Sequence, residues 1–146
     1  MNLKELRIGF FGGIASIEIR FENGRPVTGG GLGSRIFSGD GSGAQIVPVF
    51  DALRWVLFGR TTGKAGEDAA GPRAVQLDFD AFSIHRNETA TGTLLRFFQY
   101  DPNPFCCAVT VKELTKETAE ETQKLIDDAV GISESDFEKF LQTIQQ

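Results

Sequence analysis

Residues 5 to 20 form a self-complementary pattern about the pair Gly12-Gly13, and this pattern constrains the fold more than any other stretch. If the two glycines make a two-residue turn, the flanking residues face each other on two antiparallel strands. The facing residues agree in character, and the charged ones are opposite in sign. The pairs are Phe11 with Ile14, Phe10 with Ala15, Ile8 with Ile17, Leu6 with Ile19, Arg7 with Glu18 and Glu5 with Arg20. The sequence therefore predicts an N-terminal β-hairpin.

A second turn signal, Asn23-Gly24, follows the hairpin and predicts a short third strand over residues 25 to 28. Pro26 lies within this segment and has no amide hydrogen to donate to a neighbouring strand. We therefore expect the third strand to lie at an edge of the sheet.

The next segment, TGGGLGSRIFSGDGSG at residues 28 to 43, contains seven glycines. A phosphate-binding loop requires a helix that starts directly after the glycines, but Ala44 to Val47 separate the last glycine from Pro48. We expect a mobile segment with a small apolar anchor at Ile36-Phe37. In an alternative interpretation it is a lid over a ligand, and the lid residues are then Gly29, Gly31, Gly33, Arg35 and Asp40.

An apolar helix is predicted from Pro48 to Phe58, because proline suits a first helical turn and Gly59 suits the end. Apolar residues recur at helical spacing, and Asp51 and Arg54 are the charged residues within the helix. A helix that is apolar nearly all round is either buried in the core or covered by a partner. The core interpretation is favoured. In the other, the partner-binding residues are Trp55, Phe58, Asp51 and Arg54.

Residues 75 to 111 alternate in three apolar segments and predict a three-stranded antiparallel meander. Asp78 and Asp80 form the best carboxylate pair, because their spacing places both on one face of a strand. Two such groups can act as acid and base. The favoured interpretation is a solvated strand face, with one of the two aspartates opposite Arg96.

The C-terminal part predicts two helices with capping signals. Thr115 can cap a helix that runs to Val130 and ends at Gly131. Ser133 can cap the last helix, whose apolar stripe consists of Phe137, Phe140, Leu141 and Ile144.

The charge distribution excludes several function classes. The net charge is −5, and the lysines and arginines are scattered, which argues against binding to nucleic acid or to an anionic membrane surface. Cys106 and Cys107 are adjacent and are not expected to form an ordinary disulfide, so we expect a cytoplasmic protein, with secretion as the less favoured alternative. With one histidine and two cysteines, the sequence predicts no metal site and no cofactor.

Together these features predict one α+β domain over residues 1–146. The domain consists mainly of antiparallel sheet, packed by a central helix and two C-terminal helices, with a mobile segment at 28–43 and a polar loop at 60–72. In the absence of a catalytic set, we expect a small non-enzymatic protein-binding domain, such as an inhibitor, an immunity-type protein or an assembly adaptor. Its partner is another protein or a second copy of the chain. The alternative is a small-molecule-binding protein or enzyme in which segment 28–43 closes over a Phe-lined pocket.

Overall fold

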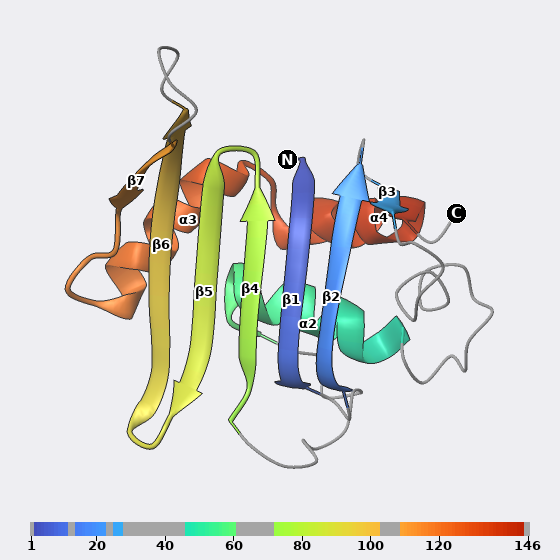
Figure 1. The fold of residues 1–146 in the computed structure, drawn as a ribbon, viewed down its shortest axis with the longest axis horizontal. Helices are drawn as coiled ribbons and strands as arrows, with labels where there is room; N and C mark the ends of the chain where they lie inside the picture. Colours follow the sequence, from blue (N-terminus) through green and yellow to red (C-terminus); the bar gives the residue numbers. More distant parts are fainter. Residues whose placement is uncertain are drawn as a thin grey trace.

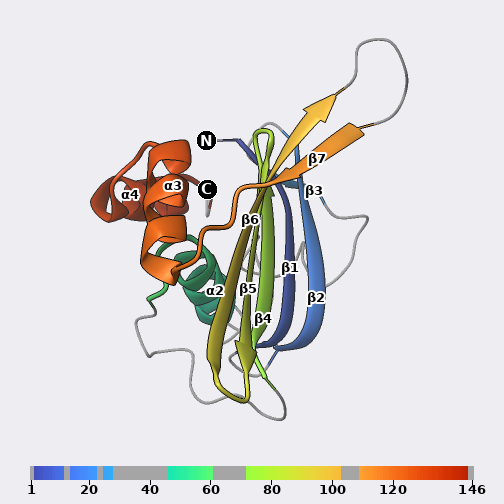
Figure 2. The same cartoon turned by 90° about the vertical axis from the view of Figure 1, so that its left-hand side faces the viewer.

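In the computed structural model, seven antiparallel strands form one sheet, and three helices of the described chain pack against one of its faces (Figure 1 and Figure 2). The structure describes residues 2–11, 14–22, 25–27, 46–60, 72–102 and 109–144. The strands are β1 Leu3–Phe11, β2 Ile14–Glu22, β3 Arg25–Val27, β4 Ala74–Phe79, β5 Phe82–Thr89, β6 Gly92–Pro102 and β7 Val109–Glu113. The helices are α2 Ile46–Phe58, α3 Ala119–Val130 and α4 Glu134–Ile144.

The N-terminal hairpin has the predicted register. Glu5 pairs with Arg20, Leu6 with Ile19, Arg7 with Glu18, Ile8 with Ile17, and Phe11 with Ile14. The predicted pair of Phe10 and Ala15 does not occur in the ladder, since Phe10 has a φ of 50° and interrupts the extended backbone. The third strand, β3, pairs with β2 and lies at the edge of the sheet, as its proline predicts.

The sheet has two halves, β1 to β3 and β4 to β7, and they join where β1 pairs with β4. This pairing is antiparallel, with Leu6 opposite Leu77 and Ile8 opposite Val75. The strand order is therefore β3-β2-β1-β4-β5-β6-β7. Both joined strands carry apolar residues on the face that the helices cover, so the hydrophobic core is continuous across the junction.

The second half of the sheet contains four strands, where the sequence predicted three. The first of the three predicted strands folds back at Asp80-Ala81 and so becomes β4 and β5, and Phe79 pairs with Phe82 across this tight turn. Asp80 has a φ of 48°, a conformation that aspartate tolerates better than most residues. Arg96 consequently lies opposite His85 and not opposite either aspartate. The α+β class and the antiparallel sheet are confirmed.

Helix α2 lies against the sheet as a core helix. It starts two residues before Pro48 and ends at the predicted place, where Gly59 has a φ of 75° and its N–H donates to the Trp55 carbonyl at 2.8 Å. Its buried residues include Val49, Leu53 and Val56, each with 0% exposure. The structure thus confirms the favoured interpretation of this helix.

Helices α3 and α4 complete the covered side of the sheet. Thr118, not Thr115, caps α3, and its hydroxyl accepts the Glu121 N–H at 3.1 Å. Thr115 is not available as a cap because its hydroxyl accepts the Phe97 N–H at 2.9 Å. Gly131 ends α3 with a φ of 71°, and Ser133 caps α4 through the Asp136 N–H at 3.1 Å, both as predicted.

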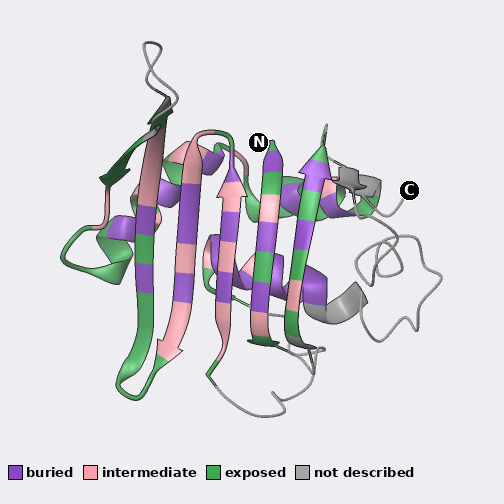
Figure 3. Ribbon diagram, in the orientation of Figure 1, coloured by how far each residue is buried: buried purple, intermediate pink, exposed green. Residues whose placement is uncertain are grey.

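The core lies between the helices and one face of the sheet (Figure 3). Phe79 and Phe97 from the sheet and Phe137 from α4 are among its largest fully buried side chains. Phenylalanine contributes large apolar area without a polar atom to satisfy. The abundance of phenylalanine in the sequence therefore serves the core at these positions. No helix in the described residues is long and apolar enough to cross a membrane.

Candidate functional site

The face of the sheet opposite the helices is called the open face here, and none of the described helices lies on it (Figure 2). Side chains alternate along each strand, so residues two apart share a face. Charged residues from β1 and β2 occupy one side of the open face: Glu5, Arg7, Glu18 and Arg20. Polar residues from β4 and β5 occupy its centre: Gln76, Asp78, Ser83, His85 and Asn87.

The remaining side of the open face carries an apolar strip on β6 and β7, defined as Leu94, Phe98, Tyr100 and Val111. Leu94 is 48% exposed and Val111 is 54% exposed, whereas the two aromatic residues are half-buried. The same side also carries the exposed ion pair of Arg96 and Glu113 at 2.8 Å, so the open face combines an apolar strip with charged residues on both of its sides. Exposed apolar side chains beside charged ones also occur in protein interfaces.

Three polar side chains form a hydrogen-bonded row in the centre of the open face. The Ser83 hydroxyl donates to Asp78 Oδ1 at 2.6 Å, and His85 Nε2 lies 3.1 Å from the same hydroxyl. Because the single hydroxyl hydrogen goes to Asp78, Nε2 must carry a hydrogen and donate it to Ser83. In a hydrolytic triad the serine donates to the histidine instead. Ser83 is also 0% exposed, so the row does not present a nucleophile to a substrate.

The histidine of this row is held in its neutral form. Burial lowers the pKa of His85, Asp78 raises it, and the positive charges of Arg96 and Arg7 lower it further. The imidazole ring lies 4.9 Å from the Phe98 ring, and Arg96 lies 4.9 Å above that same ring. An apolar and cationic environment of this kind disfavours the imidazolium form.

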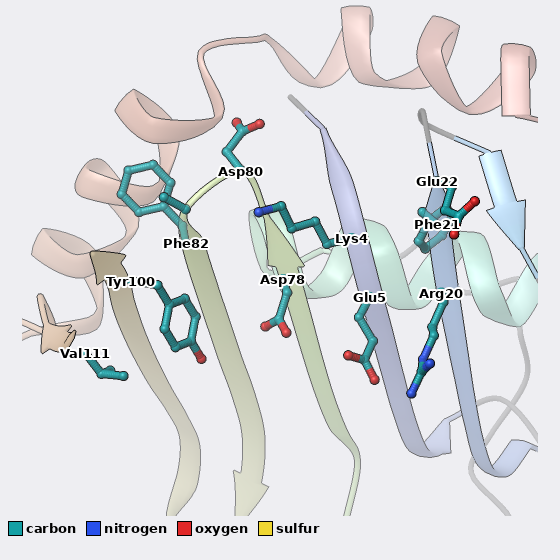
Figure 4. A pocket seen from close by; sticks show the side chains of 11 residues that line it. Lys4, Glu5, Arg20, Phe21, Glu22, Asp78, Asp80, Phe82, Tyr100 and Val111 are labelled. Atoms are coloured by element: carbon teal, nitrogen blue, oxygen red, sulfur yellow. The ribbon is translucent and has the colours of Figure 1, made fainter. Parts of the chain in front are cut away.

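A hollow of ≈630 Å³ lies on the open face near the β4–β5 turn (Figure 4). Its walls include the apolar residues Phe21, Phe82, Tyr100 and Val111, the basic residues Lys4 and Arg20, and the acidic residues Glu5, Glu22, Asp78 and Asp80. Four carboxylates and two cations make it acidic. Of these carboxylates, Asp78 is fixed by two bonds at Oδ1, from Ser83 at 2.6 Å and from Gln76 at 3.4 Å.

The predicted carboxylate pair is split by the turn. Both Asp78 and Asp80 line the hollow, but Asp78 belongs to β4 and Asp80 begins the turn, so they do not share a strand face as predicted. Figure 4 shows their carboxylates pointing in different directions. Asp80 Oδ1 accepts the Asn2 N–H at 2.9 Å and so fixes the start of β1 against the turn.

The four residues predicted as a partner surface on α2 make contacts within the chain. Asp51 is 0% exposed and Trp55 is 5% exposed. Arg54 donates to Asp51 Oδ1 at 2.9 Å and forms two bonds with Glu138 of α4, at 2.5 and 2.8 Å. The half-buried ring of Phe58 packs edge-on against Phe137 of α4, with the ring centroids 5.5 Å apart. Trp55 and Asp51 could therefore contact a partner only if α2 left the sheet.

Several predicted residues lie outside the described part of the chain. They are the candidate lid residues Gly29, Gly31, Gly33, Arg35 and Asp40, together with Cys106 and Cys107. Within the described residues, no three potential metal ligands lie close enough together to hold an ion.

Sequence reasoning did not single out Arg86, a buried cation on the helix-covered face. Arg86 is 7% exposed, and burial lowers the pKa of its guanidinium to about 10. Its Nη2 donates to Gln123 Oε1 of α3 at 2.6 Å, and Nε and Nη2 both lie 3.4 Å from the Val56 carbonyl near the end of α2. A cation is favourable at a helix C-terminus. Arg86 thus links β5 to two helices, and no local motif marks this role.

No protein-family model matches the chain, and no curated protein matches it significantly.

Proposed function

We propose that this chain is a protein-binding domain that contacts its partner through the open face of its sheet. The observation that carries the proposal is the asymmetry of the sheet: all three described helices pack on one face, and the other presents the apolar strip, the charged residues and the hollow. Exposed aliphatic and aromatic side chains beside charged ones are typical of surfaces that bind proteins.

The proposed surface differs from the helix that the sequence suggested. Trp55 and Asp51 of α2 are buried in the folded chain, whereas Leu94 and Val111 are the most exposed large hydrophobic residues of the described chain. The hollow has an excess of carboxylates and the chain has a net charge of −5. A basic partner surface therefore complements it, and such complementarity accelerates association at low salt.

Affinity capture from native lysate, at low and at high salt, tests this proposal. Leu94→Glu changes the apolar strip, and Glu22→Lys reverses a charge in the hollow. Lys139→Glu, on the exposed side of α4, is the control. We expect the two open-face variants to lose a stoichiometric partner that the wild type and the control retain. Retention of that partner by both open-face variants, or its loss only with the α4 variant, contradicts the proposal.

A second candidate function is binding of a small molecule in the hollow. Its ≈630 Å³ lies within the range of ligand pockets, ~300–1,000 Å³, and it combines Tyr100 and Phe82 with the fixed carboxylate of Asp78. Thermal shift against nucleotides, sugars, acyl-CoA and lipids tests this function. A shift of several degrees that Tyr100→Ala abolishes supports it, and the absence of any shift across the panel counts against it.

A further inference from the structure

The two edges of the sheet differ in their capacity to accept another strand. At one edge, β3 has three residues and its central residue, Pro26, lacks an amide hydrogen. At the other edge, β7 has five residues, contains no proline and pairs with β6 without a register shift. The β7 edge therefore retains a regular row of backbone donors and acceptors.

Two hydrogen bonds determine which backbone groups of β7 point outward. The Tyr100 N–H donates to the Ala81 carbonyl at 2.7 Å, so the backbone polar groups of Tyr100 face β5. Val111 lies opposite Tyr100, so its N–H and carbonyl point away from β6. The Leu114 N–H donates to the Phe97 carbonyl at 2.7 Å, so the backbone groups of Leu114 face β6 and those of the preceding residue, Glu113, point away from it. Val109, Val111 and Glu113 thus direct their backbone groups to the side of β7 on which no described strand lies.

The side chains of this edge are exposed on both faces. Thr110, Val111, Lys112 and Glu113 are all exposed, and Figure 2 shows the β6–β7 hairpin projecting beyond the part of the sheet that the helices cover. Val111 has an exposed fraction of 54%, the highest among the large hydrophobic residues described. An incoming strand would bury this side chain at little steric cost.

We propose that two copies of the chain pair β7 with β7, antiparallel, about a two-fold axis at Val111. The outward-facing residues are symmetric about this position, so Val111 exchanges hydrogen bonds with its copy and Val109 exchanges them with Glu113 of the other copy. This assembly goes beyond the proposed function and rests on separate observations. It joins two sheets into one and leaves both open faces on the same side.

The register of this pairing is chemically self-complementary. On the open face Tyr100 neighbours Val111 within one chain, so the dimer forms a continuous apolar row of Tyr100 and Val111 from each copy. On the other face Lys112 lies opposite Thr110 of the second copy, so no like charges are directly opposed. Complementarity of this kind favours a second copy over an unrelated strand.

Light scattering and sedimentation equilibrium up to millimolar concentration test the dimer. The paired segment is short, so we expect a dissociation constant between the micromolar and millimolar ranges, with a limiting mass twice the 15.9 kDa of the chain. Val111→Pro removes the central outward N–H, and Val111→Lys keeps it but places two cations at the axis. Leu94→Lys is the control, because it changes an exposed apolar residue of the same face that lies on β6 outside the segment paired with β7.

We expect each Val111 variant to weaken dimerisation more than about tenfold, and the control to leave it unchanged. If Val111→Pro does not fold, Val111→Lys carries the test alone. Hydrogen exchange of residues 109–113 should slow with increasing concentration in the wild type. A wild-type chain that stays at 15.9 kDa at millimolar concentration overturns the proposal, as does a dimer that the Val111 variants leave intact. Binding of an unrelated protein to β7 of a monomeric chain also overturns it.

Discussion

The buried contact between Arg86 and Gln123 gives a quantitative test of how the sheet and helices are held together. Gln123 accepts from Arg86 at 2.6 Å, and its Nε2 donates to the Leu57 carbonyl at 2.7 Å. Gln123→Leu removes both bonds, together with the exposed bond from Nε2 to Asp127 Oδ1 at 2.9 Å, and leaves the guanidinium with the Val56 carbonyl at 3.4 Å. A hydrogen bond to a charged group contributes about 1.5–3 kcal/mol and a neutral one about 1 kcal/mol. We therefore expect Gln123→Leu to lower the free energy of unfolding by about 2.5–4 kcal/mol.

A double-mutant cycle isolates the contact itself. Arg86→Met removes the cation together with its unfavourable desolvation, so its cost should be smaller, about 1–2 kcal/mol. In the double variant no buried cation remains without its acceptor, and the combined loss should be less than the sum of the single losses by about 1.5–3 kcal/mol. Urea unfolding followed by the fluorescence of Trp55, the single tryptophan, measures the free energy of unfolding of the wild type, both single variants and the double variant. Losses that add within about 0.5 kcal/mol would refute the proposed linkage.

Three further predictions concern other parts of the fold. Burial lowers the pKa of His85 in the folded chain, so as pH falls the unfolded chain binds a proton at this residue before the folded chain does. Stability should therefore decline below pH about 6.5, and His85→Gln should reduce the pH dependence of urea midpoints measured between pH about 7.5 and 5.5. Phe137→Ala removes a fully buried ring and should lower the free energy of unfolding, measured in urea, by about 3–5 kcal/mol. Phe10 is 41% exposed, so Phe10→Ala should lower it by less than about 1 kcal/mol, and equal losses would contradict the core assignment. Gly59→Ala should lower the melting temperature more than Gly131→Ala. Both glycines have positive φ, but a Cβ added at Gly59 would lie 3.0 Å from Arg86 Nη1, whereas a Cβ at Gly131 would lie 4.0 Å from its nearest neighbour. A larger effect at Gly131 would contradict this ranking.

Features with local physical signals were predicted well from the sequence. The Gly12-Gly13 hairpin combines turn residues, apolar alternation and opposite charges, and all three indicate the same register. The ends of α2 and α3 follow from the glycines at 59 and 131, and the start of α4 from Ser133.

Features that depend on distant residues were not predicted. The turn at Asp80-Ala81 carries no glycine or asparagine, so it resembles an irregular strand until the Asn2 backbone is seen to pair with Asp80. The junction of β1 with β4 joins segments far apart in the chain, and neither strand specifies its neighbour.

The same limit applies to the candidate site. The sequence marked Asp78 as a residue to consider, and it lies on the open face, where Ser83 links it to His85. Alternation along the strand places Leu94 and Tyr100 on one face of β6, but the sequence could not show which face the helices leave open, or that Val111 lies opposite Tyr100. For Trp55 the signal was ambiguous, since an apolar helix looks alike whether the sheet or a partner covers it.

Site-specific photo-crosslinking tests the open face as the binding surface most directly. A photoreactive phenylalanine analogue is placed at Leu94 or Glu18 on the open face, and at Lys139 or Glu120 on the exposed sides of α4 and α3. We expect both open-face positions to crosslink to one common protein in native lysate, and both helical positions to give no such product. A common protein captured from the helical positions, with none captured from the open face, would contradict the proposed binding surface.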